Sequence, residues 1–205
     1  MYDRPVNTKQ RAQPLSPEAR RQTIVDAVIP LLLQDGPKVT TAQIAAAAGI
    51  AEGTIFRVFP DKATLLFEAV RASFDPAPEL DMLARIEKAL PFGIKLRKAA
   101  AILVKRGERV HALAATLRSI EPPPGLSLHD AHKTIVEANS LLFSAIARLF
   151  QEESSKLAVE PAKAAAALRG LLFAVSFPLN DPDEMITADE AVDILLDGVL
   201  AEGRV

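Results

Sequence analysis

Residues 40–62 read TTAQIAAAAGIAEGTIFRVFPDK, and this stretch decides the fold. Thr40 and Gln43 have the spacing of a capping box, in which the hydroxyl caps a helix and the side chain three residues later reaches back. Gly49 is expected to end that helix, because glycine readily takes the positive φ of a turn. A second short helix is predicted over 52–58. The stretch therefore predicts two short helices joined by a turn.

Apolar or small residues recur where these two helices would share a core: Ile44, Ala45, Ala48, Ile50, Ile55 and Val58. Two short helices that cross at a steep angle, as in a helix-turn-helix, need this pattern. The opposite face, with Glu52, Thr54 and Arg57, is then free for the major groove of DNA. An ordinary helical hairpin is the alternative, since alanine-rich helices that end at glycine are common.

Helices are predicted on both sides of this stretch. Ser16-Pro17-Glu18 is a helix start, and the helix should end at Gly36-Pro37 with a kink at Pro30. A helix at 62–73 follows residues 40–62. The remaining helices are predicted near 79–89, 92–107, 108–119, 127–153, 161–178 and 187–201.

The composition is that of a globular, helical protein. Apolar residues make up 49% and charged residues 24% of the 205 residues, and alanine and leucine dominate. The absence of cysteine excludes disulfides and thiolate metal sites. No apolar run approaches the ~18 residues that span a bilayer, and the N-terminus has no apolar signal core. We therefore expect an all-α fold, no membrane segment and a cytoplasmic, nucleoid-associated protein.

The net charge of −2 is unusual for a DNA-binding protein, but its distribution is uneven. Residues 1–62 hold eight lysines and arginines against six acids, a net charge of +2, which leaves −4 for the rest. A cationic N-terminal part and an anionic remainder fit a partner with negative charge. Charge alone does not establish DNA binding.

The longer run from Thr40 to Leu66 closely resembles the signature of the TetR/AcrR family of transcriptional regulators. Ile24-Val25-Asp26-Ala27 and Gly36 lie where the first helix of that family and its end are found, so the resemblance covers about residues 18–74. It implies an N-terminal three-helix helix-turn-helix head that binds DNA and a helical body for ligand binding and dimerisation. The implied division is a flexible basic arm at 1–15, a head at 16–62 and a body at 63–205.

The resemblance assigns contacts with the DNA backbone to particular residues. Thr41, assisted by Gln43, would bond a phosphate, and Lys62 would hold another by its charge. The family usually has tyrosine where this chain has Phe56, and that hydroxyl normally bonds a phosphate. Because phenylalanine has no hydroxyl, one backbone contact is expected to be lost.

The resemblance also assigns the reading of bases. Gly53, Thr54 and Arg57 lie where family members touch bases and nearby phosphates. Glu52 would accept a hydrogen bond from a cytosine amino group, or simply favour the helix N-terminus. Phe59 corresponds to a buried aromatic residue that locks the recognition helix.

Cationic residues precede the motif. Arg4, Lys9 and Arg11 lie in the arm, and Arg20 and Arg21 follow in the first helix. A cationic arm can enter the minor groove of DNA. A solvated tail without function is the alternative.

In the family, the later helices form a ligand chamber and the last two pair with a second subunit. Candidate pocket residues here are Phe92, Leu96, Leu103, Leu113, Phe143, Ile146 and Phe150. Candidate dimerisation residues are Leu168, Leu172, Phe173, Leu195, Leu196 and Val199. For both sets, burial in the core of one chain is the alternative. With no tryptophan and a single tyrosine, Tyr2, the effector is expected to be small and apolar.

Metal and catalytic chemistry have little support. His129 and His132 lie three residues apart on one helical face, which suits a metal, but no third ligand has an evident spacing. No nucleophile elbow and no phosphate-binding glycine loop occur in the sequence. We therefore expect no enzyme activity, no metal and no cofactor.

The sequence thus favours a ligand-responsive repressor that binds a palindromic operator as a homodimer. Two alternatives remain at this stage. One is a ligand-independent activator or architectural DNA-binding protein. The other is a helical small-molecule-binding protein or enzyme with a vestigial head.

Overall fold

The computed structural model describes residues 16–125, 127–177 and 186–199, and every regular element in these ranges is a helix. The elements are α1 (Pro17–Asp35), η1 (Gly36–Lys38), α2 (Thr41–Ala48), α3 (Glu52–Val58), α4 (Lys62–Ala72), α5 (Ala77–Ala84), α6 (Phe92–Arg118), α7 (Leu128–Gln151), η2 (Ser154–Lys156), α8 (Pro161–Ser176) and α9 (Ala188–Val199). The expected all-α fold is confirmed.

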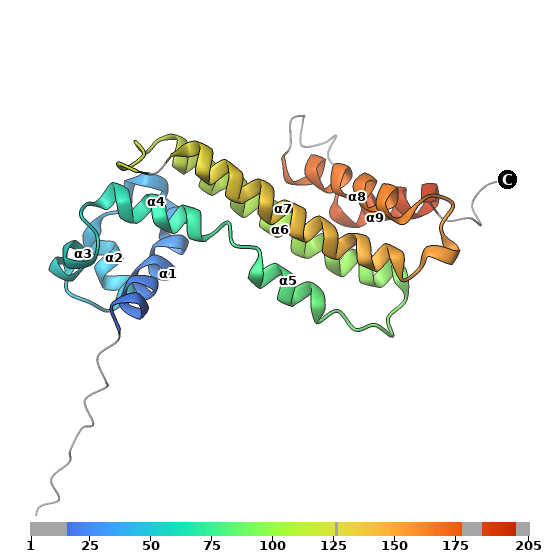
Figure 1. Ribbon diagram of the computed structural model, residues 1–205, viewed down its shortest axis with the longest axis horizontal. Coiled ribbons are helices and arrows are strands. Elements are labelled where there is room, and N and C mark those ends of the chain that lie inside the picture. The colour runs from blue at the N-terminus through green and yellow to red at the C-terminus, as the bar shows by residue number, and fades with distance from the viewer. Residues whose placement is uncertain (1–15, 126, 178–185, 200–205) are drawn as a thin grey trace, which may run out of the picture.

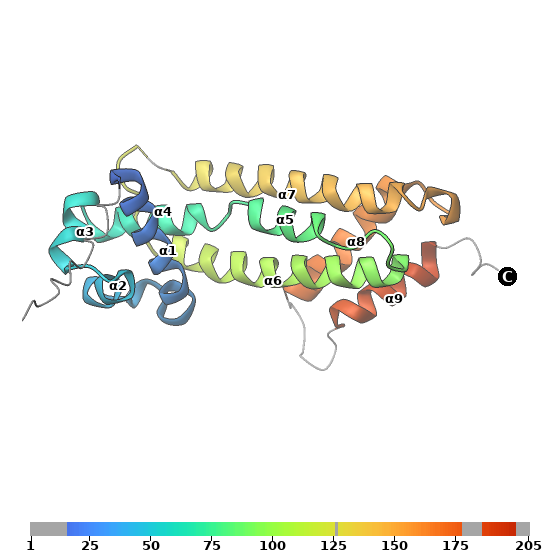
Figure 2. The same cartoon turned by 90° about the horizontal axis from the view of Figure 1, so that it is seen from below.

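The molecule is elongated, with a head of four helices at one end and a helical body (Figure 1). Helices α1 to α4 form the head. In the body, α6 and α7 run antiparallel along the long axis and reach back to the head. Helix α5 lies on one side of this pair, and α8 and α9 lie on the other side, at the end away from the head (Figures 1 and 2).

Helix α1 begins as its sequence predicts. The Ser16 side chain accepts a hydrogen bond from the backbone N–H of Ala19 over 3.1 Å, and proline occupies the first helical position, where its missing N–H costs nothing. The helix then continues through Pro30 to Asp35 as one element, and Pro30 lies on its exposed side. The chain turns into η1 at Gly36, which has a φ of 58°.

The helix-turn-helix is built from local signals. Both bonds of the capping box are present: the Thr40 hydroxyl accepts from the Gln43 N–H, and the Gln43 side chain accepts from the Thr40 N–H. Gly49 ends α2 in the left-handed conformation, with a φ of 66°. Asp61 caps α4 by accepting from the N–H of Thr64 over 2.7 Å, and this hydrogen bond lowers the pKa of the Asp61 carboxyl.

The core of the head extends beyond the three helices of the motif. Ile24, Ile44 and Ile55 come from α1, α2 and α3, and the buried face of α4 packs against them. Leu113 adds the head-side end of α6 to the same cluster. The buried cluster therefore does not stop at the boundary predicted at residue 62, and α4 packs as part of the head.

Helix α6 corrects the prediction of two helices at 92–107 and 108–119. The structure has one helix from Phe92 to Arg118, and it continues through Gly107. A glycine in the interior of a helix is destabilising relative to alanine. Here Gly107 faces Ser176 on α8, and a side chain at this position would collide with it.

The remaining helices differ from the predicted ones mainly at their ends. Helix α5 ends at Ala84, five residues before the predicted end, and α7 ends at Gln151, where η2 follows. None of the helices in the described ranges combines the length and hydropathy needed to cross a bilayer.

Candidate functional site

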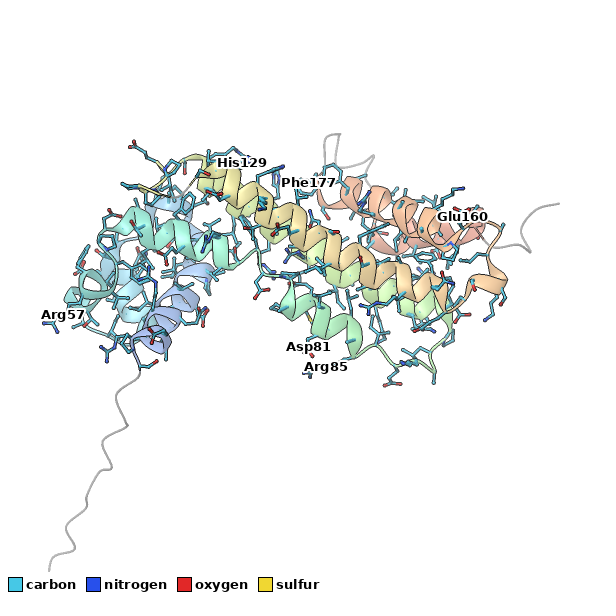
Figure 3. All side chains as sticks on the ribbon, viewed as in Figure 1. Arg57, Asp81, Arg85, His129, Glu160 and Phe177 are labelled. Atoms are coloured by element: carbon cyan, nitrogen blue, oxygen red, sulfur yellow. The ribbon has the colours of Figure 1, made fainter. Side chains whose placement is uncertain are left out.

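Helix α3 lies at the outer end of the head, away from the body (Figure 3). Its inner face is fixed by Ile55, which is fully buried in the head core. Its other face carries Gly53 and the exposed side chains of Phe56 and Arg57, with Thr54 half-buried beside them. Figure 3 shows Arg57 at the extreme end of the molecule. The helix therefore presents one face to the solvent, and no other part of the described chain covers it.

Arg57 has no hydrogen bond and no ion pair within the part of the chain that the structure describes. A shallow surface depression between α1 and α3 places it near Arg20 and Thr54. Arg57 is exposed and Arg20 is half-buried, and Glu18 borders the same depression. Two guanidinium groups at one concave surface can bind phosphate oxygens or base edges. The sequence did not indicate that Arg20 and Arg57 share a surface, since 37 positions separate them in the chain.

The other expected contacts in α2 and α3 are engaged within the head. The Thr41 hydroxyl donates to the Glu52 carboxylate, so the second and third helices are joined across the turn. Gln43 donates to Asp35 over 3.2 Å in addition to its role in the capping box. All four side chains lie near the surface, so DNA can reach them, but a phosphate must compete with these partners.

Lys62 and Phe56 also lie where DNA can reach them. The Lys62 ammonium donates to the backbone carbonyl of Pro37 over 3.1 Å. Phe56 is 51% exposed although it is a large apolar residue. A phenyl ring held in water is unfavourable unless a partner covers it. Its position fits a surface that is occupied in a complex.

Arg21 is a structural residue that sequence reasoning grouped with the cationic arm. Its guanidinium lies over the ring of the buried Phe59, 4.2 Å from the ring centroid. It also forms an ion pair with Glu68 of α4 and donates to the carbonyl of Val58 over 2.8 Å. Arg21 thereby ties α1 to the end of α3 and to α4, and it holds the recognition helix at a fixed angle. Its charge is not free for DNA.

The body holds a partly open cavity of about 560 Å³ between α6, α7 and α8. This volume is in the usual range for small-molecule sites, roughly 300–1,000 Å³. Three predicted pocket residues, Leu103, Phe143 and Ile146, line it. Most of the remaining lining is apolar: Val110, Ile135, Leu142, Ala165, Leu168, Leu172, Phe173 and Phe177.

The other four predicted pocket residues lie elsewhere. Phe92 and Phe150 pack edge to face, with ring centroids 5.4 Å apart, and Leu96 is fully buried in the body core near them. Leu113 lies in the core of the head. Helix α6 advances about 1.5 Å per residue, so Leu113 is about 15 Å from Leu103 along the helix. These four residues are core residues in this chain.

A polar network borders the inner wall of the cavity. Arg106 lines the cavity and is only 3% exposed. It donates to Glu79 over 3.0 Å and to the carbonyls of Phe74 over 2.8 Å and Asp75 over 3.3 Å. Arg109 donates to the other oxygen of Glu79 over 2.6 Å. Phe74 and Asp75 directly follow α4, so this network joins the cavity to the helix that leaves the head.

Burial makes the charged form of Arg106 less favourable than it is in water. Burial lowers the pKa of its guanidinium from the ordinary value, and the ion pair with Glu79 opposes that effect. Its Nε has no hydrogen-bond partner among the residues that the structure describes. Sequence reasoning missed Arg106, because its partners lie about thirty positions away along the chain.

The predicted dimerisation residues divide into two groups. Leu168, Leu172 and Leu195 are buried within the single chain. Phe173 is 58% exposed and Leu196 is half-buried. Val199 ends α9, and its side chain lies outside the described residues. These three leucines pack in the body core, where α8 and α9 lie against α6 and α7.

The histidines form no cluster. His129 and His132 are exposed near the head-side end of α7 (Figure 3). Within the described ranges, no three histidine, aspartate or glutamate side chains gather in a way that suits a metal ion. His111 packs edge to face on Phe177, with ring centroids 4.9 Å apart.

The head, its free recognition helix and the cationic depression define a helix-turn-helix DNA-binding protein. The family model described as "Bacterial regulatory proteins, tetR family" matches residues 24–69. This match lies within the head, and it confirms there the resemblance on which the run from Thr40 to Leu66 was interpreted. No curated protein matches the chain at a significant level.

Solved structures with the same fold match most of the chain. A TetR-family regulator from Mesorhizobium loti is 17% identical, with a TM-score of 0.62, and the match covers 92% of this chain and all of the other. A regulator from Saccharomonospora viridis, solved in complex with choline, is 18% identical, with a TM-score of 0.63 and coverages of 90% and 99%. The fatty acid degradation regulator FadR from Bacillus halodurans is 20% identical, with a TM-score of 0.54 and coverages of 89% and 94%.

Proposed function

We propose that this protein is a ligand-responsive transcriptional repressor that binds a palindromic operator as a homodimer and acts in the cytoplasm, at the nucleoid. The observation that carries the proposal is the exposed face of α3, on which Arg57 has no partner in the described chain. Thr54 and the nearby Arg20 extend that face. One recognition helix reads only a half-site, so two heads related by a two-fold axis are needed for a palindrome.

The outer face of α8 supports dimerisation. Its exposed residues are small or apolar apart from one lysine: Ala162, Lys163, Ala166, Ala167, Gly170, Phe173 and Ala174. Arg169 is also exposed, but it borders the cavity and stays outside the proposed interface. Small side chains let two helices approach closely, and Phe173 gives an aromatic anchor. On α9, Ile194 is also exposed. Pairing of α8 and α9 across the two-fold axis would remove these residues from water.

The dimer is tested with Phe173→Glu. A carboxylate buried at an apolar interface costs more than the interface gains, so this variant should be a monomer in sedimentation velocity. Met82→Glu is the matched control. Met82 is an exposed apolar residue on α5, on the other side of the α6–α7 pair (Figure 1). Loss of the dimer in both variants, or in neither, would count against this interface.

The cavity supports a response to a small molecule. Its volume suits such a ligand, and it adjoins the contacts between Arg106 and the residues that follow α4. The choline complex of the Saccharomonospora viridis regulator is consistent with a small-molecule effector for this fold. A ligand that prefers one spacing of the two heads would shift the population and weaken operator binding.

DNA binding is tested by selecting bound sequences from a random pool, followed by footprinting of the winning sequence. A protected palindrome supports the proposal. Salt-sensitive binding without sequence preference would instead favour an architectural protein, and no binding would favour a vestigial head.

The role of Arg57 is tested with Arg57→Ala on the selected sequence. A base contact is worth about 1–3 kcal/mol, so this variant should bind less tightly and with relaxed specificity. Lys62→Ala should weaken binding to all sequences alike and reduce the salt dependence. Arg85→Ala, at an exposed arginine of α5, is the control and should bind as the wild type does. Equal binding by all three variants would overturn the assignment of α3.

A further inference from the structure

Among the described residues that line the body cavity, the two charged ones are cationic. Arg106 lies on the inner wall, and Arg169 lies at the exposed rim. This described lining contains no aspartate and no glutamate. The rest of the wall is apolar apart from Asn139 and Ser176, with Gly107 and Gly170. A cavity of this kind favours an apolar molecule with an anionic group over a neutral or cationic one.

Two carboxylates act on the positive charge beside the inner wall. Glu79, which is 1% exposed, is shared by the guanidinium groups of Arg106 and Arg109, and the charge of Asp75 also acts on Arg106. Arg109 is partly exposed and can be hydrated, whereas Arg106 is buried. Of these four groups only Arg106 lines the cavity, so the charge that a ligand meets at the inner wall is positive.

Arg106 also has a donor to offer. Its Nε is buried and has no hydrogen-bond partner among the described residues, and a buried donor without a partner is unfavourable. Nε and one Nη lie on the same edge of a guanidinium, and this edge binds a carboxylate with two parallel hydrogen bonds. The Nη2 donor already binds the carbonyl of Phe74. An anion at Nε would compete with that carbonyl.

We infer that the cavity binds an amphipathic carboxylate, with its anionic group on Arg106 and its apolar part against Leu103, Phe143 and Ile146. The inference rests on the proposed ligand response and adds the chemical class of the effector. Binding at the Nε edge loosens the hold of Arg106 on the carbonyl that follows α4, so the ligand acts on the helix that joins head and body. Arg169, whose guanidinium lies 4.7 Å from the centroid of the Phe143 ring, attracts the anion at the rim.

The probe series is octanoate, octan-1-ol and octyltrimethylammonium, all below their micellar concentrations. They share an apolar chain and differ in the charge of the head group. Binding to the full chain without DNA is measured by titration calorimetry. Octanoate is expected to bind at least tenfold more tightly than the other two. Octanol or the cation binding as tightly as octanoate, or binding by none of the three, would overturn the inference.

Three variants test whether the two arginines of the cavity bind the anionic group. Arg106→Lys keeps the positive charge but lacks the guanidinium edge that forms two parallel hydrogen bonds. It should weaken octanoate binding roughly ten- to hundredfold. Arg169→Met, at an exposed position, should weaken it by a few fold. Arg148→Met, at an exposed arginine of α7 outside the cavity, should leave it unchanged. If Arg106→Lys does not fold, the inference is tested by the three probes on the wild-type protein and by Arg169→Met. Wild-type affinity in a folded Arg106→Lys would overturn the inference.

Release of the protein from its operator is measured separately from the binding of octanoate. Octanoate should release the wild-type protein from its selected operator, and it should release Arg106→Lys only at roughly tenfold or higher concentration. A protein that binds octanoate but no operator would refute the proposed function and leave the ligand class standing. A protein that binds the operator but prefers octanol would refute the ligand class and leave the proposed DNA binding standing.

Discussion

Gly107 of α6 and Ser176 of α8 approach so closely that a β-carbon on Gly107 would lie 2.5 Å from the Ser176 hydroxyl oxygen and 2.7 Å from its β-carbon. The serine is itself held in place, because its hydroxyl donates to the carbonyl of Leu172 over 2.9 Å. The two helices therefore meet at a position where only hydrogen fits. This contact lies at the wall of the cavity, which both residues line.

Gly107→Ala is expected to destabilise the protein although alanine favours helices. Rotation of the serine does not relieve the collision with its β-carbon, so α6 and α8 must separate, at a cost of about 1–3 kcal/mol. Gly53→Ala, measured without DNA, is the control, because no atom lies within 4 Å of an added β-carbon there, and it should be neutral or stabilising by up to about 1 kcal/mol. Urea denaturation measures both. Adding Ser176→Gly to Gly107→Ala should restore part of the lost free energy of unfolding.

Phe56→Tyr is expected to strengthen DNA binding. The family usually has tyrosine here, and its hydroxyl bonds a phosphate. Phe56 is exposed on the outer face of α3, so the added hydroxyl meets no steric obstacle within the head. One neutral hydrogen bond contributes about 0.5–1.5 kcal/mol, so affinity should rise about two- to tenfold for all sequences. Fluorescence anisotropy on selected and unrelated duplexes checks this. Phe56→Leu, which cannot form the bond, should show no gain.

The contact between Arg21 and Glu68 should couple α1 to α4. Both side chains are partly exposed, so the coupling free energy in a double-mutant cycle with Arg21→Met and Glu68→Gln should be about 1 kcal/mol or less. Arg21→Met should cost more than Glu68→Gln, because it also removes the contacts with Phe59 and the Val58 carbonyl. Equal losses from the two single variants would show that those two contacts contribute nothing.

Glu153 makes stability depend on pH. Hydrogen bonds from Lys156 and from the buried Lys95 lower the pKa of its carboxyl below the ordinary 4.5. A lowered folded pKa stabilises the folded state above the unfolded value, and this stabilisation disappears as the pH falls through the folded pKa.

Glu153→Gln should therefore lower the urea midpoint at pH 7, and the difference from wild type should shrink as the pH is taken below 4.5. Lys95→Met is the control for the buried cation. It removes both the charge and its need for a partner, so it should cost less at pH 7 than Glu153→Gln. A difference that stays constant from pH 7 to pH 3 would contradict this account.

The elements that the sequence predicted correctly are set by local signals. Thr40 and Gln43 form the capping box, and Gly49 takes the left-handed turn, all within ten residues of one another. The recognition helix needs nothing more than these signals and its apolar positions. The family signature adds the rest of the head.

The parts that escaped prediction depend on partners far along the chain. The close approach of Gly107 to Ser176 joins residues 69 positions apart. Arg21 contacts Glu68 across 47 positions, and Arg106 finds its partners about thirty positions away. Leu113 has the spacing of a pocket residue, but the length of α6 carries it into the head. Residues 1–15, including the proposed role of the arm, lie outside the described residues.

The division of labour within α3 has a consequence for evolution. Ile55 holds the helix in the head, whereas Gly53, Phe56 and Arg57 face outward, and an added β-carbon at Gly53 meets no atom within 4 Å. Substitutions at the outward positions leave the packing of the head unchanged. After gene duplication, a descendant copy can therefore acquire a new operator sequence without first passing through poorly folded intermediates.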